Sequence, residues 1–321
     1  MKNIVAMGEL LIDFIPVQKG VFLKNVNEFI KMPGGAPANV VTTVSKLGGK
    51  GRFIGQVGQD AFGDYLKETL QKYHVDVTYL EQTDQAKTAL AFVSLTEDGE
   101  RDFIFFRNPS ADQLFDSSQI KKESFDNSIF HFCSVSLTDD PIKAAHLYAI
   151  HIMKENNGFI SFDPNVRLAL WKDHEKYKKI IREFIPFADL LKISLDELEF
   201  ISGIHDEKEA IASCFVGDVK YVILTRGIEG VDLYTKSKVY HAPGFKVSTI
   251  DTTGAGDSFI GAFLYQLAKE ELNDENQDEK LVEYLKFANA TAALTTTRLG
   301  AMHAIPDLSE VQSFLRQYDK K

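Results

Sequence analysis

The stretch Asp251-Thr252-Thr253-Gly254-Ala255-Gly256-Asp257-Ser258-Phe259 joins a run of small residues to an acid at the expected start of a helix. The apolar residues that follow recur at helical spacing: Phe259, Ala262, Phe263 and Leu267. This pattern predicts a helix that begins near Gly254 and buries the apolar stripe. The first backbone N–H groups of a helix have no partner within the helix and lie at the positive end of its dipole. Residues 254–257 are therefore predicted to form an anion-binding turn.

Asp257 lies beside this predicted anion site. The glycines Gly254 and Gly256, with Ala255 between them, leave room for a phosphate group. A carboxylate in that place would repel the phosphate unless its task were to accept the proton of an attacking hydroxyl. The segment thus predicts a phosphoryl-transfer site with Asp257 as general base. The alternative is that Asp-Thr-Thr-Gly only caps a helix, since these residue types are common in caps and turns.

Length and composition indicate a globular α/β protein. The chain of 321 residues is long enough for one large domain or two ordinary ones. It carries 36 basic and 46 acidic residues, a net charge of −10. This excess of acid argues against nucleic acid or an anionic membrane as the main partner, so a nucleotide must be held by local donors.

The two cysteines, Cys133 and Cys214, stand alone, so neither a disulfide framework nor a zinc site is indicated. A reducing cytoplasm is the expected location. Glu9 and Asp13 interrupt the first apolar stretch too early for a secretory signal. No uncharged run approaches the roughly 18 apolar residues of a transmembrane helix.

Short apolar runs alternate with helical patterns along the chain. Buried parallel strands are predicted at 4–7, 53–57, 129–133, 159–162, 190–193 and 221–224. Helices are predicted at 38–47, 62–73, 141–154, 175–184, 197–201 and 281–297. This is the pattern of a doubly wound α/β fold. Two regions, 14–32 and 88–107, contain strand formers without an intervening helix, and they predict a small separate sheet.

The segment 251–259 is similar to the second signature of the ribokinase-like (PfkB) carbohydrate kinases. The resemblance extends from Gly8 to the loop after Gly300. It implies a three-layer α/β/α core with a mostly parallel sheet, formed by residues 1–13, 33–87 and 108–321. It also implies that 14–32 and 88–107 form a small β lid over the sugar site, whose free face often pairs with a second subunit. The family assigns the catalytic base to Asp257 and the anion hole to the amides of residues 254–257.

The sugar-binding side is expected near the N-terminus. Asp13 follows the first strand, so we expect it at the carboxyl end of that strand, where open α/β sheets bind ligands. The turn Gly34-Gly35 leads into a helix that carries Asn39, whose amide can donate to and accept from a polyol. Each feature alone could be a strand-end acid or a helix start. The resemblance to the first family signature gives sugar contact to Asp13, Gly34, Gly35 and Asn39.

Two longer segments, 98–112 and 161–171, are similar to fructokinases within the family. The first implies that a lid strand delivers Arg107 toward the sugar, the alternative being a solvated edge arginine. In the second, Asn165 and Arg167 follow a buried strand, so both are expected to reach the site. Asn165 would contact the sugar and Arg167 would neutralise phosphate charge. The alternative for Arg167 is a salt bridge at a helix start.

The nucleotide side is expected after the next two strands. Lys192-Ile193-Ser194-Leu195-Asp196-Glu197 aligns with the family's Asn-x-x-Glu element, with Ser194 in place of the Asn. Glu197 would organise hydrated Mg²⁺, which needs few direct protein ligands, and Lys192 is assigned to the nucleotide site. The turn at Thr225, Gly227 and Gly230 resembles the nucleotide-binding turn. Asn289 either lines the adenine pocket or lies on a helix surface.

The loop after the long C-terminal helix is the candidate site for a monovalent cation. In many ribokinase-like enzymes, carbonyls of this loop and the first Asp of the signature hold K⁺. The matching positions are Asp251, Thr295, Arg298, Gly300 and Ala304. A plain structural loop is the alternative.

These expectations together predict an ATP-dependent sugar kinase that makes fructose 6-phosphate from D-fructose, with ATP and Mg²⁺ and with K⁺ as a further candidate ion. One alternative is a 2-keto-3-deoxygluconate kinase, in which Arg107 would bind the substrate carboxylate. Another is a sugar-binding relative without catalysis. The expected partners are small molecules and a second copy of the chain through the lid.

Overall fold

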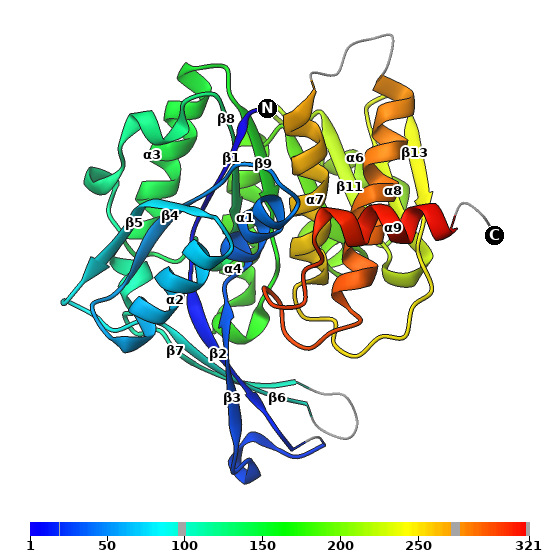
Figure 1. Ribbon diagram of the computed structural model, residues 1–321. Coiled ribbons are helices and arrows are strands. Elements are labelled where there is room, and N and C mark those ends of the chain that lie inside the picture. The colour runs from blue at the N-terminus through cyan, green and yellow to red at the C-terminus, as the bar shows by residue number, and fades with distance from the viewer. Residues whose placement is uncertain (19, 96–100, 271–276, 319–321) are drawn as a thin grey trace.

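The computed structural model describes residues 1–18, 20–95, 101–270 and 277–318. Within them, a central sheet has nine strands in the order β13-β12-β11-β10-β9-β8-β1-β4-β5 (Figure 1). Seven are mutually parallel: β1 (Asn3–Met7), β4 (Gly51–Gly58), β5 (Asp76–Thr83), β8 (Ser128–Cys133), β9 (Phe159–Asp163), β10 (Leu190–Ser194) and β11 (Tyr221–Thr225). At one edge, β12 (Gly230–Tyr234) and β13 (Val239–Pro243) are antiparallel.

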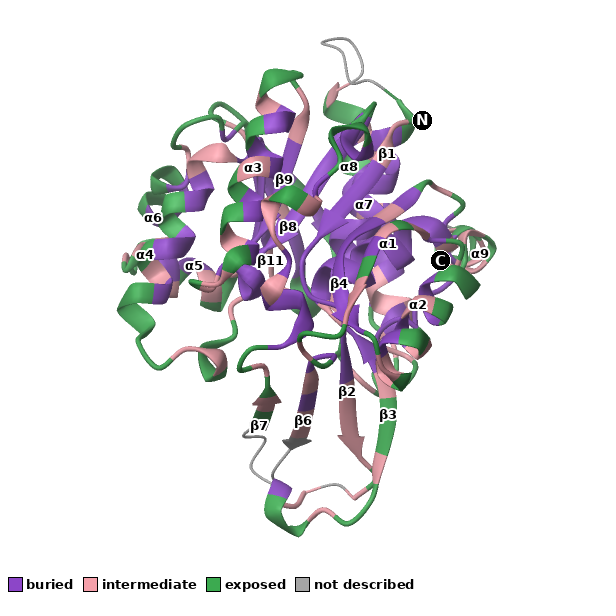
Figure 2. Ribbon diagram, turned by 90° about the vertical axis from the view of Figure 1, so that its left-hand side faces the viewer, coloured by how far each residue is buried: buried purple, intermediate pink, exposed green. Residues whose placement is uncertain are grey.

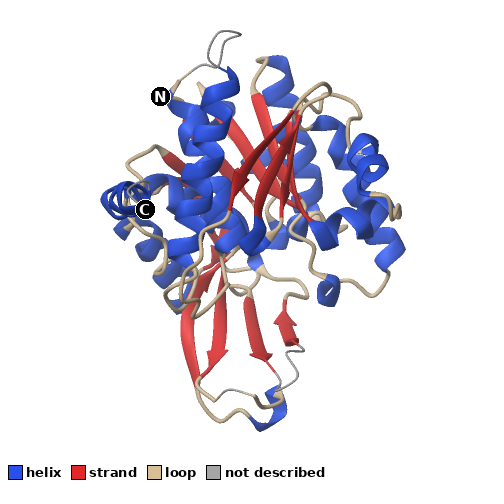
Figure 3. Ribbon diagram, turned by 90° about the vertical axis from the view of Figure 1, so that its right-hand side faces the viewer, coloured by secondary structure: helices blue, strands red, loops and turns tan. Residues whose placement is uncertain are grey.

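Helices cover both faces of this sheet (Figure 3). One face carries α1 (Ala36–Lys46), α2 (Ala61–Lys72), α7 (Ala255–Lys269), α8 (Gln277–Thr295) and α9 (Leu308–Tyr318), and the other carries α3 (Pro141–Glu155), α4 (His174–Phe184), α5 (Leu195–Ser202) and α6 (Glu207–Ser213). Short 3-10 helices lie in the connections: Leu23–Asn25, Ala111–Leu114, Ser117–Gln119, Lys122–Phe125, Ser134–Ser136, Leu168–Leu170, Ile185–Phe187 and Gly227–Glu229.

The apolar core is divided by the sheet into two clusters, as a three-layer α/β/α fold requires (Figure 2). In β1, Ile4 and Ala6 pack on one side while Val5 and Met7 pack on the other. Successive strand side chains point to opposite faces, so a strand buried on both faces is apolar throughout. The predicted ribokinase-like fold class is confirmed, including the six predicted parallel strands.

A second sheet projects from the core (Figures 1 and 2). Its strand order is β3-β2-β6-β7, formed by β2 (Leu11–Pro16), β3 (Phe29–Gly34), β6 (Leu90–Leu95) and β7 (Arg101–Phe106). The stacked rings of Phe14 and Phe92, with centroids 4.6 Å apart, meet Phe62 of α2 at its base. The predicted small sheet is therefore present, while the turn predicted at Asp98-Gly99 lies outside the described residues.

The predicted position of Asp13 was wrong. It lies in the middle of β2, paired with Met32 of β3 and Ala91 of β6, and not at the carboxyl end of β1. The apolar run from Leu10 to Ile12 reads as a continuation of the first strand, but the chain leaves the central sheet at Gly8. The small sheet consequently includes residues 11–13 and 33–34, which the sequence assigned to the core.

The predicted helix start was correct. Gly254 is the N-cap of α7 and has a left-handed φ of 74°. A Cβ at Gly254 would lie 2.8 Å from the Cβ of Ala301, so glycine is needed for both conformation and space. Among the residues that the structure describes, no helix is both long and apolar enough to cross a lipid bilayer.

Candidate active site

Asp257 lies in the first turn of α7 and is buried. Its Oδ2 accepts a hydrogen bond from Asn39 Nδ2 over 2.8 Å, and its Oδ1 accepts one from Asn165 Nδ2 over 3.0 Å. Asn39 belongs to the first turn of α1, and Asn165 follows β9. The structure thus brings three predicted site residues from distant parts of the chain together around one carboxylate.

The surroundings of Asp257 suit a proton acceptor. Burial raises the pKa of Asp257 above its usual value of 3.8, and it outweighs the opposing effects of the Asn39 and Asn165 hydrogen bonds and of the nearby Arg167 and Lys192. A carboxylate with a raised pKa is a stronger base, while the two amide donors keep it oriented.

The neighbouring space has the donors and acceptors of a polyol site. Asn39 is buried, and its Oδ1 has no hydrogen-bond partner within the protein. A buried acceptor left without a partner is costly, so this atom fits a ligand hydroxyl. Asp13 is half-buried beside it, and its pKa is raised to about 7 by burial and by the like charges of Asp257 and Glu9, against the opposing effect of Arg167.

Glycines shape this part of the site. A Cβ at Gly34 would lie 2.0 Å from Asp13 Oδ2, so only glycine leaves room for that carboxylate. A Cβ at Gly35, whose φ is 114°, would lie 2.3 Å from the carbonyl oxygen of Glu9. The packing therefore leaves no room for a side chain at either of the predicted residues Gly34 and Gly35.

The chain after β9 forms a tightly held turn. Asn165 has a left-handed φ of 48°, which is uncommon for a residue other than glycine. Its N–H donates to Asp163 Oδ1 over 3.1 Å, and the next N–H, of Val166, donates to Glu197 Oε1 over 2.7 Å. Arg167 follows and is exposed at the mouth of the site, close enough to lower the pKa values of Asp13 and Asp257.

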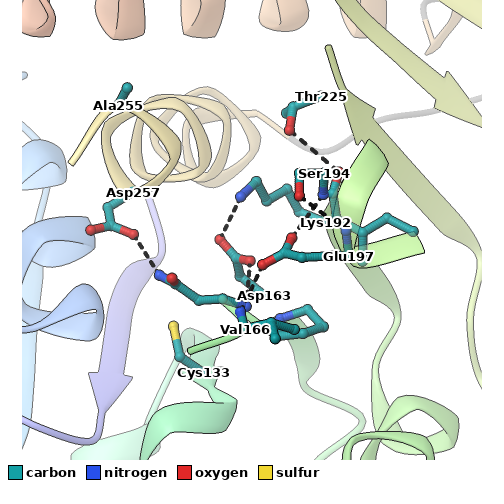
Figure 4. A network of polar contacts seen from close by, with 12 residues as sticks. Cys133, Asp163, Val166, Lys192, Ser194, Glu197, Thr225, Ala255 and Asp257 are labelled. Atoms are coloured by element: carbon teal, nitrogen blue, oxygen red, sulfur yellow. Dashed lines mark hydrogen bonds and ion pairs between the residues drawn. The ribbon is translucent and has the colours of Figure 1, made fainter. Parts of the chain in front are cut away.

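Lys192 lies on the other side of the anion-binding turn (Figure 4). Its Nζ bonds to Asp163 Oδ2 over 2.9 Å, and it is 3.1 Å from the place that a Cβ on Gly256 would take. Burial alone would lower the pKa of Lys192, but Asp163 and Glu197 raise it above its usual value, so the group is cationic. An ammonium group therefore faces the first turn of α7, where the Ala255 N–H donates to the Thr252 carbonyl over 3.2 Å.

Glu197 and Ser194 form a capping box at the start of α5. Glu197 Oε2 accepts from the Ser194 N–H over 2.8 Å, and the Ser194 hydroxyl accepts from the Glu197 N–H over 3.4 Å. The serine in the place of the family's asparagine thus fixes the acid that follows. Burial raises the pKa of Glu197, but Lys192 and the two N–H donors outweigh it and lower the pKa below its usual value.

These residues fit a hydrated Mg²⁺ carried by a nucleotide. Within the described ranges, no group of three or more His, Cys, Asp or Glu side chains could hold a metal ion by itself. Each oxygen of the ionised Glu197 accepts one backbone N–H and keeps capacity for a second donor such as metal-bound water. This agrees with the preference of Mg²⁺ for water and phosphate oxygens with few protein ligands.

The predicted nucleotide-binding turn lies next to this acid. Thr225 at the end of β11 pairs with Ser194 in the sheet, and its hydroxyl donates to the Ile193 carbonyl over 3.3 Å. Gly227 has a φ of 56° with open space around its Cα, whereas Gly230 has a φ of 112° and approaches the Ala242 carbonyl closely. The turn is thus open at Gly227 and packed at Gly230.

Asn289 is buried in α8, so the alternative of a surface asparagine was wrong. Its Nδ2 donates to the carbonyl oxygens of Ala242 and Pro243 over 3.1 and 3.0 Å. Asn289 thereby fixes β13 to α8, and its Oδ1 is the atom left for a ligand.

The loop predicted to bind a monovalent cation also comes together. Asp251 Oδ2 accepts from the Gly300 N–H over 2.8 Å, and Asp251 N–H donates to the Thr296 carbonyl over 3.2 Å. Thr295 is buried, and the side chain of Arg298 pairs with Glu310. The Ala304 N–H donates to the Ala301 carbonyl over 3.0 Å. The Asp251 carboxylate is therefore held against the backbone of this loop at Gly300, and Arg298 would contribute to a cation site only through its backbone.

Arg107 is directed elsewhere. Its side chain is only 4% exposed and forms a buried ion pair with Asp112, and its Nη1 donates to the Val135 carbonyl over 3.4 Å. The alternative of a solvated edge arginine was therefore wrong. Its Nε has no hydrogen-bond partner within the protein, so this is the donor that a sugar contact, as the sequence predicts, could use without breaking the pair with Asp112.

Two buried acids of this region were missed. Glu9 accepts from the Ala36 N–H over 3.1 Å and from the Ser136 hydroxyl over 2.7 Å, which holds the start of α1. Asp163 binds Asn165 and Lys192. Both acids adjoin strongly apolar runs, Ile4–Met7 and Phe159–Phe162, and this position at the end of a buried strand was the available signal.

Comparisons with known proteins agree with this geometry. The profile of the pfkB family of carbohydrate kinases matches residues 1–308. The "Probable fructokinase-5" of Arabidopsis thaliana is 43% identical over 321 residues, 99% of this chain and 98% of that protein. The crystal structure of a Xylella fastidiosa fructokinase with bound ATP has a TM-score of 0.91 and 34% identity, covering 99% of this chain and all of the other. A double mutant of the Vibrio cholerae O395 fructokinase, with fructose, ADP and a potassium ion bound, has a TM-score of 0.87 and 34% identity over 98% of each chain.

Proposed function

The chain belongs to the pfkB family of carbohydrate kinases, and on this basis we propose that it is an ATP-dependent fructokinase that makes fructose 6-phosphate. One observation carries the proposal. Asp257 lies in the anion-binding turn that begins α7 and accepts a hydrogen bond from Asn39, whose Oδ1 has no partner within the protein and fits a sugar hydroxyl. The relatives named as fructokinases support the choice of sugar.

The sugar is proposed to bind between the small sheet and the start of α1. Asp13 would accept two hydroxyl groups, and Asn39 Oδ1 would accept a third. Gly34 and Gly35 keep this space open. Asn165 contacts the sugar from the opposite side, and Arg107 is the further candidate contact. The sheet formed by β2, β3, β6 and β7 would cover the bound sugar and exclude water that would otherwise be phosphorylated.

Transfer is proposed to proceed by direct attack. The 6-hydroxyl oxygen of fructose bonds to the γ-phosphorus of ATP, the bond from that phosphorus to the bridging oxygen breaks, and ADP leaves with the electron pair. Asp257 takes the hydroxyl proton as the new bond forms. The amides of Gly254 and Gly256, together with Arg167, stabilise the charge on the moving phosphoryl group. The Ala255 amide would join them by leaving the Thr252 carbonyl, to which it donates over 3.2 Å.

The nucleotide is proposed to lie along the ends of β10 and β11. Lys192 binds phosphate oxygens, Thr225, Gly227 and Gly230 form the wall beside the nucleoside, and Asn289 offers its Oδ1 to the base. Bound Mg²⁺ would neutralise phosphate charge, with Glu197 holding one of its waters. The candidate ligands for K⁺ are Asp251 and carbonyl oxygens of Thr295, Arg298, Gly300 and Ala304.

A homodimer through the small sheet is part of the proposal. Ile104 and Phe106, two residues apart on β7 and therefore on one face of this sheet, are 49% and 59% exposed, which is unusual for large apolar side chains. Light scattering of the protein at micromolar concentration tests this, and Phe106→Glu should give a monomer. The two cysteines are free and buried, which supports a reducing cytoplasm as the location.

The relatives named as fructokinases favour fructose over 2-keto-3-deoxygluconate. A sugar acid needs a cation for its carboxylate, and Arg107 is paired with Asp112 except at its Nε, which has no partner within the protein. The intact set of Asp257, Lys192 and Glu197 argues against a relative that only binds sugar.

Phosphorus NMR of the product formed from ATP and fructose tests the proposed function. The proposal expects a single phosphomonoester at oxygen 6. A product phosphorylated at another oxygen, or no product with fructose, would overturn it.

A further inference from the structure

Asp163 has no role assigned so far, although it lies at the centre of the site (Figure 4). It ends β9, is fully buried, and uses its two oxygens on different partners. Oδ1 accepts the Asn165 N–H over 3.1 Å, while Oδ2 binds Lys192 Nζ over 2.9 Å. Asn165 donates a hydrogen bond to the proposed base Asp257, and Lys192 faces the proposed phosphate site.

The hydrogen bond that Asp163 Oδ1 accepts affects the orientation of the proposed base, Asp257. Asn165 holds the left-handed φ of 48°, a conformation that costs free energy for a residue with a Cβ and persists only where neighbours impose it. In this conformation its Nδ2 donates to Asp257 Oδ1 over 3.0 Å. The bond from Asp163 to the Asn165 N–H therefore helps set the direction from which the amide reaches Asp257.

The ion pair between Asp163 Oδ2 and Lys192 affects the proposed phosphate site. A lysine side chain has four rotatable bonds, and its ammonium is a point charge without the fixed geometry of a guanidinium. Asp163 confines Lys192 Nζ to a position facing Gly256 in the anion-binding turn. The Glu197 carboxylate adds attraction there, because its charge also raises the pKa of Lys192.

We propose that Asp163 is a positioning residue that aligns the two halves of the reaction, with one oxygen fixing the amide that orients Asp257 and the other fixing the ammonium that binds the transferred phosphate. This inference rests on the proposed kinase function. It predicts that a single change at Asp163 alters both kcat and the KM for Mg·ATP, while the KM for fructose changes little.

Asp163→Asn is the first variant. The amide retains an oxygen for the Asn165 N–H, but it presents an NH₂ group to Lys192, so a donor faces a donor. We expect the KM for Mg·ATP to rise about tenfold or more and kcat to fall by about tenfold to a hundredfold, the range given by loss of a charge-assisted hydrogen bond. The KM for fructose should differ from the wild-type value by less than about threefold.

Asp189→Asn is the matched control. Asp189 is also buried, accepts the Ile160 N–H over 2.9 Å and binds Lys220 over 2.8 Å, but it precedes β10 at the opposite end of the sheet. A purely structural role for such a carboxylate predicts similar effects of both variants. Our proposal expects Asp189→Asn to lower the melting temperature and to leave kcat and both KM values unchanged.

A double-variant cycle with Lys192→Met tests whether Asp163 affects ATP binding through Lys192. If Asp163 acts on ATP through Lys192, Asp163→Asn adds less than about threefold to the KM for Mg·ATP once Lys192 is Met. Additive effects, or wild-type kinetics in Asp163→Asn, would overturn the proposal. If Asp163→Asn does not fold, Lys192→Met should raise the KM for Mg·ATP. Asn165→Gly should lower kcat and leave the KM for Mg·ATP unchanged, because it removes the amide that orients Asp257 while glycine keeps the left-handed backbone. Failure of either variant to show its effect would overturn the proposal.

Calorimetric titration with Mg·ATP separates this inference from the proposed function. If the wild-type protein releases no ADP with fructose, the proposed function fails. Asp163→Asn should still bind Mg·ATP about tenfold more weakly than wild type, and equal binding would overturn the role assigned to Asp163.

Discussion

Asn39 and Asp257 are 218 residues apart in the sequence, yet Asn39 Nδ2 donates to Asp257 Oδ2 over 2.8 Å. The contact exists because α1 and α7 lie side by side. A Cβ at Gly261 of α7 would lie 2.7 Å from the Thr43 Cβ of α1, so glycine permits this close approach. The first turns of the two helices therefore meet. α1 contributes the Asn39 amide, which is proposed to bind the sugar, and α7 contributes the proposed base Asp257.

Gly34→Ala should impair sugar binding without affecting ATP. The added methyl group would lie 2.0 Å from Asp13 Oδ2, so the carboxylate must move away from the sugar. We expect the KM for fructose to rise about tenfold or more, since each lost hydrogen bond to a charged group contributes about that factor. Steady-state kinetics with both substrates measures this, and an unchanged KM for fructose would contradict the placement of the sugar beside Asp13.

The pH dependence of the reaction should reflect Asp13. Its pKa of about 7 means that the carboxylate is largely protonated at pH 6 and ionised at pH 8. A neutral acid accepts hydroxyl hydrogen bonds less well, so kcat/KM for fructose should fall as the pH drops from 8 to 6. Asp13→Asn should lose the contribution of Asp13 to this limb, so the fall in kcat/KM between pH 8 and pH 6 becomes smaller. A variant that keeps the limb near pH 7 would show that another group titrates there.

The ionisation of Asp13 should lower the stability of the fold, although it favours sugar binding. Because the folded-state pKa of Asp13 is raised from 3.8 to about 7, its contribution to stability is present at low pH and is lost as the pH rises through 7. Asp13→Asn should therefore raise the melting temperature at pH 8, and the gain should shrink toward pH 4. Calorimetric scans at both pH values test this, and a lower melting temperature for the variant at pH 8 would contradict the raised pKa.

The pair of Arg107 and Asp112 should contribute strongly to stability. Both side chains are buried, with 4% and 1% exposure, so removing one partner leaves an unpaired charge. Arg107→Met should destabilise the fold by about 3–5 kcal/mol, the usual cost of breaking a buried pair. The double variant with Asp112→Leu should recover much of that loss, since both partners of the pair are then removed together. Urea denaturation measures both variants, and the KM for fructose of the double variant reports whether Arg107 also contacts the sugar.

The parts of the fold that were predicted depend on local patterns. Runs such as Phe159–Phe162 are apolar because both faces of the strand are buried, and α7 could be located because Gly254 and the stripe after it fall at helical spacing. The strands β5, β12 and β13 and the helices α6 and α9 were missed. Their patterns mix exposed and buried residues, as in β13, where Tyr240 and Ala242 alternate with exposed neighbours.

The contacts of the site depended on the fold itself. Asp13 was assigned to the wrong sheet because Leu10 to Ile12 continue the apolar run after β1. Asp163 and Lys192 meet only because β9 and β10 are adjacent and parallel, and the pairing of Arg107 with Asp112 needs the turn after β7. Residue type and position predicted Asp257 and Asn165, but the partner that each side chain binds could not be read from spacing.

ADP release with Mg·ATP and K⁺, measured across fructose, glucose, mannose, ribose, tagatose and 2-keto-3-deoxygluconate, is the decisive test of a fructokinase with Asp257 as its base when Asp257→Asn is measured alongside. Fructose should have the highest kcat/KM. Asp257→Asn should lower kcat by about 10² to 10⁴-fold, the range for loss of a general base, with unchanged ATP affinity. A higher kcat/KM for another substrate, or near wild-type turnover by Asp257→Asn, would contradict this assignment.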